Sequence, residues 1–362
     1  MAPLLAGDSP SYTIVYQSQG SCTGVTAVFD ADPAKRVIKD IPAAGGRAAN
    51  YAVFFKPDGS TQECFLDGTN TNNWPEVDLG ISDVYASSCG VTSAPAGVTI
   101  RDFYGPIQPM VFVVPAASTQ RSISEEAAYL AFGLGGGQDR SKPWIDPSFF
   151  FVRNASSGTQ QMVAKAIHVP GNQWWGLDRG SNTNVVAQMK IVLDQPTAEK
   201  SLGIVSVDFA DSERNNLKIL AFKARGQSCG YLPDSSPTSR DKINVRDGHY
   251  PIWGPVHLFA RTTGSLPNAA AGAFIGRFAA PRVDKSLVDA VVAKGLVPQC
   301  AMRVSRTDEV GVGAMSSLSP AFQCGCYFDF KANGATSCKA CTGPAQCSGA
   351  TSACNFGYCE AR

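Results

Sequence analysis

Short apolar runs alternate along the chain with stretches in which apolar residues recur every three or four positions. Apolar runs of four to eight residues, bounded by Gly, Pro, Asn or Asp, are typical of buried strands. They predict strands at 12–17, 50–55, 77–84, 110–114, 149–152, 202–207, 217–221 and 256–260. The helical spacing predicts helices at 25–30, 124–134, through 162–167, at 181–193 and at 284–295. Ser124 is the expected N-cap of the second of these helices, and glycines end it.

Strands that alternate with helices indicate an α/β fold with mainly parallel sheets. In such sheets ligands bind beyond the carboxyl ends of the strands. Residues 225–248 are polar and have no strong periodicity, and no internal repeat is present. We therefore look for chemistry in the turns that follow the strands.

The composition excludes several classes of function. Hydrophobic residues make up 44 % of the 362 residues, which is enough for a sizeable core. Lys and Arg number 31 against 30 Asp and Glu, so the net charge is +1 and no overall field attracts nucleic acid or anionic lipid. The sequence has no run of 18 apolar residues, so it does not predict a membrane-spanning helix. A bound anion would have to be held by local geometry.

Twelve cysteines point to an oxidising compartment. Seven lie in the last 39 residues, a density typical of a small module held by disulfides. Zinc is the alternative for the CxxC at 338–341, but a second CxxC at the usual distance is missing and the region has no His. Since seven is odd, full pairing would join this region to the body, with Cys300 as the candidate partner. The disulfide candidates are Cys300, Cys324, Cys326, Cys338, Cys341, Cys347, Cys354 and Cys359.

Three turns have the form expected of an anion site: a strand, then small and hydroxyl residues, then a helix or loop. They are residues 20–24 (GSCTG), 81–83 (ISD) and 153–159 (RNASSGT). A helix N-terminus offers free N–H groups, and arginine offers a bidentate fork for an oxyanion. The carboxylate of Asp83 suits an anion that carries a proton, as phosphate does and sulfate does not. Ordinary helix capping explains each turn equally well when it is taken singly.

Four segments in the same order resemble one family. They are YQSQGSCTGV (16–25), DLGISDVYAS (78–87), RNASSGTQQ (153–161) and DGHYPIWGPVHLFAR (247–261). Together they are similar to the phosphate-binding protein of the high-affinity phosphate ABC transporter. The resemblance implies a two-lobed periplasmic-binding fold (type II) that closes over inorganic phosphate, without a cofactor or metal and without enzyme activity. It also implies a periplasmic or extracellular location and the membrane components of an ABC transporter as partners.

The resemblance also implies the roles of particular residues. Ser21 corresponds to the hydroxyl donor of the first lobe, and Ser82 and Asp83 to the turn whose carboxylate accepts the phosphate proton. Arg153, Ser157, Gly158 and Thr159 correspond to the cradle of the second lobe. Segments 105–114 and 250–260 correspond to the crossovers. The expected division is therefore 1–106 with 257–323 for the first lobe, 107–256 for the second and 324–362 for a cysteine-rich tail.

Three departures from the family pattern lead to further expectations. Ala155 stands where the family usually has Asp, so we expect Arg153 to be less restrained. Cys22 lies inside the first binding loop. Only about eleven residues precede the strand predicted at 12–17, whereas we expect the family's first strand–helix unit to come before it. Because no signal peptide is evident either, we expect the native product to begin upstream or to have lost its signal.

Two other functions remain open at the level of the sequence. The first is a cell-surface structural or interaction protein on the same fold, with a vestigial anion site. The second treats residues 20–24 as the G-x-C-x-G form of a nucleophile elbow, with Cys22 as nucleophile and His249 or His257 as base. A disulfide at Cys22 would exclude this hydrolase.

Overall fold

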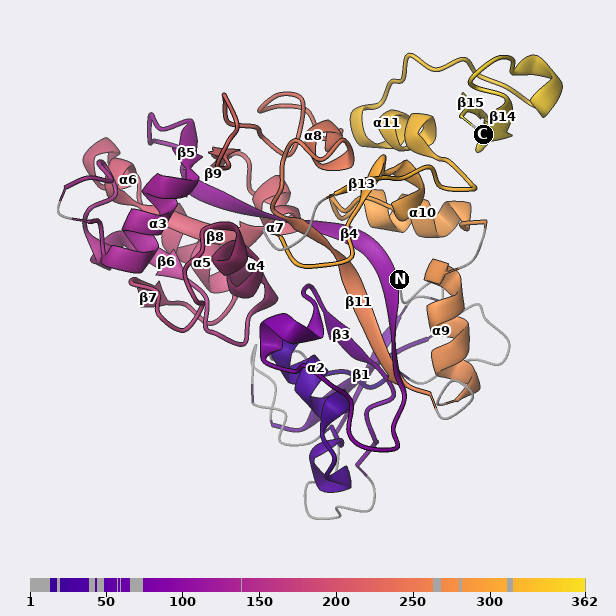
Figure 1. Cartoon of the computed structure of the whole chain (residues 1–362), viewed down its shortest axis with the longest axis horizontal. Helices are drawn as coiled ribbons and strands as arrows, with labels where there is room; N and C mark the ends of the chain where they lie inside the picture. Colours follow the sequence, from indigo (N-terminus) through magenta and orange to yellow (C-terminus); the bar gives the residue numbers. More distant parts are fainter. Residues whose placement is uncertain are drawn as a thin grey trace.

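Two long strands, β4 (Ile100–Pro115) and β11 (Trp253–Arg261), form the centre of the computed structural model and connect its parts (Figure 1). One end of β4 pairs with β11, and the other pairs with β8 and β9. A seven-stranded sheet in the order β3-β11-β4-β8-β6-β7, with β9 also on β4, therefore runs from one half of the molecule to the other. The structure describes residues 14–17, 20–38, 43, 49–56, 58, 60–65, 74–137, 139–262, 268–279, 282–310 and 315–361.

The small lobe, which we define as residues 20–38, 74–109, 253–262 and 268–279, carries one helix on each face of its strands. On one face, Val25 and Val28 pack against Phe259. On the other, Ile275 packs against Leu258 and Ala260. Besides β11 and part of β4, the elements are α2 (Ser21–Phe29), η1 (Pro33–Lys35), β3 (Gly80–Ser82), η3 (Ala86–Cys89) and α9 (Ala269–Ala279).

The large lobe, which we define as residues 110–252, contains most of the apolar core. Phe112, on the buried part of β4, stacks between Phe132 and Phe222. The strands are β5 (Ser122–Ser124), β6 (Phe150–Val152), β7 (Leu177–Asp178), β8 (Leu202–Ser206), β9 (Leu217–Ile219) and β10 (Ala221–Lys223). The helices are α3 (Glu125–Leu134), η4 (Pro147–Phe149), α4 (Gly158–Ala166), α5 (Asn182–Lys190), α6 (Gln195–Lys200), α7 (Val207–Ser212) and α8 (Ile243–Arg246).

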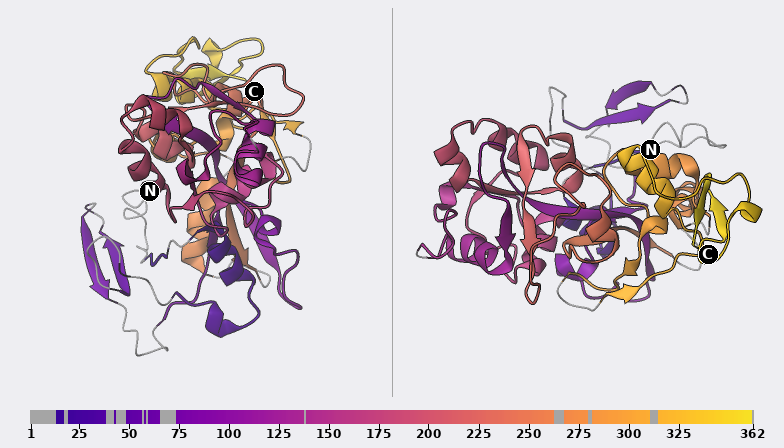
Figure 2. Two further views of the ribbon diagram at one scale, coloured as in Figure 1. Left: turned by 90° about the vertical axis from the view of Figure 1, so that its left-hand side faces the viewer. Right: turned by 90° about the horizontal axis from the view of Figure 1, so that it is seen from above.

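The C-terminal part of the chain lies beside the large lobe, on the side of α7 and α8 (Figure 1). It contains α10 (Lys285–Val292), η5 (Gln299–Ala301), β12 (Val304–Ser305), β13 (Ser316–Ser317), α11 (Gly325–Asn333), η6 (Pro344–Gln346), β14 (Ala353–Asn355) and β15 (Tyr358–Glu360). A separate antiparallel hairpin of β1 (Tyr51–Phe55) and β2 (Thr61–Phe65) stands away from the sheet, as both views of Figure 2 show.

The α/β fold expected from the sequence is confirmed, with two corrections. The central sheet is mixed: only two of its six strand pairings, β6 with β7 and β6 with β8, are parallel. The long strand β4 runs antiparallel to β11 in one half and to β8 and β9 in the other, and β3 runs antiparallel to β11. The strand expected at 12–17 is not formed in its described part, since residues 14–17 have no regular structure and the rest lies outside the described residues. The division into 1–106 with 257–323, 107–256 and 324–362 stays a prediction.

The disulfides confirm the expected pairing of the C-terminal cysteines. Cys300 pairs with Cys324 and so joins the tail to the body. Within the tail, the bridges are Cys326–Cys338, Cys341–Cys354 and Cys347–Cys359. The sulfurs of Cys341, Cys347 and Cys359 lie close enough together to hold a metal, but all three are committed to disulfides. Zinc is therefore not needed to explain these cysteines.

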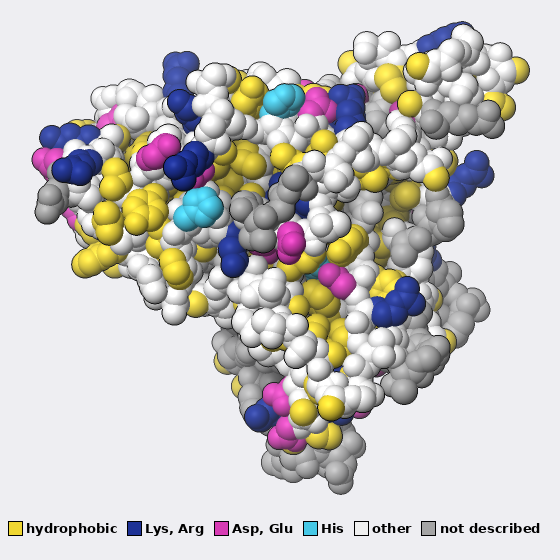
Figure 3. All heavy atoms as spheres, in the orientation of Figure 1, with side chains coloured by type: hydrophobic (Ala, Val, Ile, Leu, Met, Phe, Trp, Pro, Cys, Tyr) yellow, Lys and Arg dark blue, Asp and Glu magenta, His cyan; other side chains and the backbone are white. Residues whose placement is uncertain are grey.

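Positive and negative side chains are mixed over the surface that Figure 3 shows. In the view of Figure 3, acidic and basic side chains lie in small mixed groups, as the near-zero net charge leads one to expect. Among the described residues, none of the helices combines the length and the apolar character needed to cross a bilayer. Recognition of an anion therefore depends on individual sites.

Candidate functional site

Turns from both lobes meet in front of the crossover strands. Ser21, at the start of α2, donates its hydroxyl to Asp83 Oδ2 at 3.1 Å and accepts a hydrogen bond from the Asp83 backbone N–H, also at 3.1 Å. From the large lobe, the carbonyl of Ser156 accepts from the N–H of Cys22 at 3.1 Å. The structure therefore brings the first two predicted turns together with the third.

Two glycines allow this close approach. A Cβ at Gly158 would overlap the hydroxyl oxygen of Ser21 and would lie 2.9 Å from the Asp83 Cβ. A Cβ at Gly20, whose φ is +119°, would lie 2.7 Å from the Ser156 carbonyl oxygen. In this conformation the Ser21 hydroxyl fills the space in front of α4. An ion can enter that space only after the lobes separate or Ser21 moves.

The N-terminus of α4 supplies the large-lobe side of the site. Ser157 is its N-cap and accepts from the Gln160 N–H, and both Ser157 and Thr159 are buried. No hydrogen bond among the described residues engages the N–H groups of Gly158 or Thr159. Free N–H groups at a helix start attract anions. This turn thus has the donors that its sequence predicts.

Arg153 is restrained, contrary to the expectation from Ala155. Its Nε donates to the Gly180 carbonyl at 3.1 Å, and its Nη1 donates to Asn182 Oδ1. Burial lowers the pKa of the guanidinium, and the carboxylates of Asp83 and Asp178 oppose this shift. Asn182 is an uncharged partner, so it orients the guanidinium without neutralising it.

A chain of hydrogen bonds leads from Arg153 back to the crossover. Asn182 donates to the hydroxyl of Ser206 at 2.8 Å, and Ser206 donates to Asp208. Asp208 also accepts from the Gln108 side chain on β4 at 3.1 Å. These four residues were not found from the sequence. The available signal was that Ser206 ends β8, that Asp208 follows it and that Asn182 opens α5, because ligand-binding side chains gather beyond the ends of strands.

Asp83 is the titratable group of the site. Burial between the lobes raises the pKa of its carboxyl, and the charge of Asp208 adds to the rise. The Ser21 hydroxyl, Arg153 and His257 act in the opposite direction. A carboxyl with a raised pKa can accept a hydrogen bond from a protonated oxyanion, and on protonation it can donate one instead.

Two expected roles change. The side chain of Ser82 is not directed to the site, because its buried hydroxyl donates to the Val84 carbonyl at 2.7 Å and accepts from the Val84 N–H. Cys22 forms a disulfide with Cys89 and therefore has no thiol. The interpretation of residues 20–24 as a nucleophile elbow is therefore wrong, since only a thiolate is nucleophilic.

No family model and no curated protein matches the sequence. Solved structures similar in fold include a possible phosphate-binding protein from Planctomyces limnophilus (14 % identity, TM-score 0.41, 61 % of this chain and 80 % of that one). Others are an ABC-type phosphate transport receptor from Vibrio cholerae (16 %, 0.40, 61 % and 80 %) and a putative phosphate ABC transporter substrate-binding protein from Clostridium perfringens (11 %, 0.42, 61 % and 79 %). At such low identity, the ligand must be argued from the residues of the chain itself.

Proposed function

We propose that this protein is a binding protein, not an enzyme, that captures inorganic phosphate between its two lobes. The observation that carries the proposal is the meeting of Ser21 and Asp83, from the small lobe, with the N-terminus of α4, from the large lobe. A hydroxyl, a carboxyl and free N–H groups at one point match the donors and the acceptor of a protonated tetrahedral oxyanion. Arg153, whose charge acts on Asp83, supplies the compensating cation.

The contacts between the lobes indicate how phosphate would be captured. When the lobes separate, Ser21 no longer covers the start of α4, and the N–H groups of Gly158 and Thr159 become open to an ion. An ion bound there replaces the Ser21–Asp83 contact with bonds to both lobes, and these stabilise the closed state. Asp83 then accepts a hydrogen bond from the O–H group of phosphate, whereas sulfate has no such group and presents only acceptors to the carboxylate.

The proposal extends to the cellular setting. The five disulfides among the described residues suit an oxidising, extracytoplasmic compartment, either periplasmic or extracellular. A phosphate-binding protein in that compartment would pass its ion to the membrane components of an ABC transporter.

Thermal unfolding with phosphate and with sulfate, at matched ionic strength, tests the proposal. Phosphate at about 100 times its Kd should add about 2.7 kcal/mol to the free energy of unfolding, and sulfate should add little. Asp83→Asn should reduce the preference for phosphate, and Arg153→Gln should abolish binding of either ion. Asp78→Asn removes an exposed carboxylate five residues before Asp83 and should behave as wild type. No stabilisation by either ion would favour the vestigial site of a structural or interaction protein.

A further inference from the structure

A cavity of about 340 Å³ lies outside the site between the lobes, at the junction of the large lobe with the C-terminal helices. It is bounded by the end of α7, by α10 and by α11, the first helix after the Cys300–Cys324 bridge. A volume near 300 Å³ is at the small end of the range for ligand pockets. It suits a single ring or a short chain.

One wall of this cavity is apolar. Val292, at the end of α10, and Leu296, four residues beyond it, line the cavity with Phe328 and Ala332 of α11. Phe328 is almost fully buried, and Val292 and Ala332 are half-buried. An inorganic ion gains nothing from such a wall, whereas a ligand with an apolar group buries it there.

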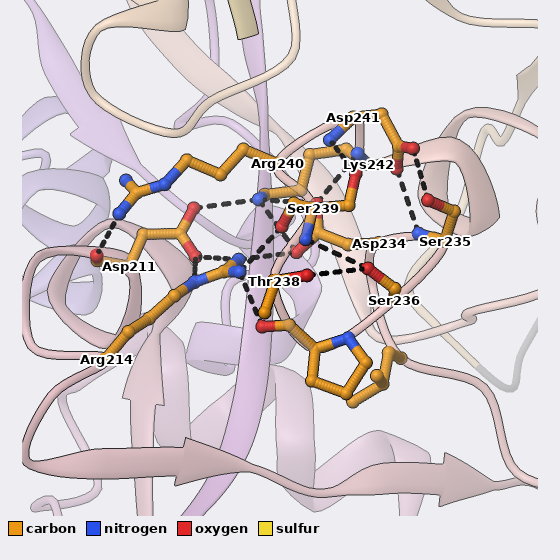
Figure 4. Close-up of polar contacts among 12 residues, drawn as sticks. Asp211, Arg214, Asp234, Ser235, Ser236, Thr238, Ser239, Arg240, Asp241 and Lys242 are labelled. Carbon is orange, nitrogen blue, oxygen red and sulfur yellow. Dashed lines mark hydrogen bonds and ion pairs between the residues drawn. The ribbon is translucent and has the colours of Figure 1, made fainter. Parts of the chain in front are cut away.

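The acids beside the cavity already have cationic partners. Asp211, together with Asp234, faces Lys242 and Arg214, so two carboxylates meet two cations (Figure 4). The Lys242 Nζ lies 2.7 Å from Asp211 Oδ2 and 2.9 Å from Asp234 Oδ1, with no exposed surface. This cluster is neutral as a whole, and its Asp211 does not offer a free charge to a ligand.

Arg240 approaches the same cluster from another side. Its Nη2 donates to the backbone carbonyl of Asp211 at 3.0 Å, and Figure 4 shows this contact apart from the carboxylate. Among the described residues, no carboxylate forms an ion pair with Arg240. The guanidinium therefore brings an unbalanced positive charge to the cavity.

Lys331 brings a second, partly unbalanced charge. Its Nζ lies 3.3 Å from Asp289, but Asp289 also lies 3.7 Å from the ammonium of Lys285 and accepts the hydroxyl of Tyr327. One carboxylate is thus shared by two ammonium groups. Together with Arg240, the rim carries more positive than negative charge.

We infer that this cavity binds a small organic anion that carries an apolar ring or chain. The anionic group of the ligand lies between Arg240 and Lys331, and its apolar group lies against Phe328 and the end of α10. Because the ligand contacts α7, α10 and α11 together, binding also holds the tail helix to the large lobe. The site is independent of the one proposed for phosphate.

Isothermal titration with phenylacetate, and with its neutral isostere phenylacetamide, tests this inference on the full-length protein. Phenylacetate should bind, and phenylacetamide should bind about tenfold more weakly or not at all, because it lacks the charge. Arg240→Gln and Lys331→Gln should each weaken phenylacetate by about tenfold, the loss of a charge-assisted contact. Lys35→Gln removes an exposed lysine from the small lobe and should leave the affinity unchanged.

Amide hydrogen exchange gives a second measurement. Phenylacetate should slow exchange across α11 and the end of α10 and leave the start of α4 unaffected. Ala332→Phe fills the cavity and should abolish binding while the protein remains folded by circular dichroism. Equal binding of the acid and the amide, unchanged affinity in both Gln variants, or displacement of phenylacetate by inorganic phosphate would each overturn the inference.

Discussion

At the scale of single residues, contact between the lobes depends on the absence of a side chain at Gly158. A Cβ at this position would overlap the hydroxyl of Ser21 and would lie only 2.9 Å from the Cβ of Asp83. The residue is buried at the first position of α4, where the backbone is helical and any residue is allowed by conformation. The requirement for glycine is therefore one of space between lobes, not of backbone strain.

Gly158→Ala should destabilise the closed structure by about 1–3 kcal/mol, the usual cost of overpacking. It should also weaken phosphate binding, because the lobes cannot meet. Gly276→Ala is the matched control, since nothing lies within 4 Å of its Cβ position in α9, and it should stabilise the protein by about 0.5–1 kcal/mol. Urea denaturation measures both changes. Equal behaviour of the two variants would contradict this account of the interface.

Asp83 should give stability a distinctive pH dependence. Burial raises the pKa of its carboxyl, so the folded protein binds a proton more tightly than the unfolded chain, whose pKa is about 3.9. The free energy of unfolding should therefore fall as the pH rises from about 4 through the pKa of the folded protein. Asp83→Asn should remove this fall, and Asp78→Asn should retain it. Parallel curves for wild type and Asp83→Asn, from urea denaturation across pH 4–7, would show that Asp83 does not titrate abnormally.

Much of the site was predictable residue by residue, because helix starts and strand ends have local signals. Ser21, Asp83 and residues 157–159 were expected together, and the structure places them together. The partners of Arg153 were not predictable, because Asn182 and Gly180 lie 27–29 residues away and carry no motif. The orientation of Ser82 was also hidden, since its bond to Val84 depends on the turn that the chain makes.

At the scale of elements, a disulfide links the helix that carries Ser21 to the turn that follows Asp83. Cys22, in the first turn of α2, pairs with Cys89, at the end of η3, across 67 residues. The same turn is held by Glu309, which accepts from the Tyr85 N–H and from the Ser88 hydroxyl. The small-lobe half of the site is therefore fixed before a ligand arrives.

Replacing both cysteines with alanine, Cys22→Ala with Cys89→Ala, should lower the free energy of unfolding by about 4 kcal/mol, the loop-closure effect for a separation of this size. Phosphate affinity should fall as well, because Ser21 is next to the bridge. Cys229→Ala is the control: this cysteine is unpaired and exposed, and the substitution should change stability by less than about 0.5 kcal/mol. Chemical denaturation and phosphate titration measure the two effects. A double variant as stable as Cys229→Ala would show that the bridge contributes nothing.

Whether a segment forms a helix or a strand was more predictable than where the element begins and ends or which strand it pairs with. The helix expected at 124–134 is α3, with Ser124 as its cap, because its apolar spacing and its stop signals agree. The strand expected at 110–114 is only the buried end of β4, which begins ten residues earlier. Gly105 and Pro106 interrupt the apolar pattern there and hide the continuation. The strand expected at 50–55 exists as β1, but its antiparallel partner β2 was not foreseen.

At the scale of the whole molecule, the disulfide-bonded tail is attached to the body by more than the Cys300–Cys324 bridge. Arg246, which is 1 % exposed, donates to the Ala301 carbonyl and to Asp329 of α11. Its guanidinium also lies 4.9 Å from the ring centre of Phe328. A buried cation thus links the large lobe, η5 and α11.

Arg246→Met should loosen the tail without unfolding the lobes. Amide exchange should become faster across α11, because the remaining covalent bridge does not hold the face of the helix. Arg303→Met is the matched control, since that arginine pairs with Asp247 on a half-exposed surface, and surface ion pairs contribute about 0–1 kcal/mol. Exchange in α11 that is unchanged in Arg246→Met, or equally raised in Arg303→Met, would assign the docking of the tail to the disulfide alone.

The pairing between β4 and β11 is irregular near the junction of the two lobes. The ladder shifts between Pro255 and His257, and a Cβ at the neighbouring Gly254 would lie 3.3 Å from the Asp83 carbonyl oxygen. The site proposed for phosphate is therefore next to the point about which we expect the lobes to rotate. Beyond this point, β4 continues from Ile107 to Pro115, an arm of about 30 Å. A rotation of the lobes about this point moves the far end of β4 more than it moves the site, because displacement grows with distance from the axis. Occupancy of the site is therefore best read at the far ends of the lobes, where the displacement is largest.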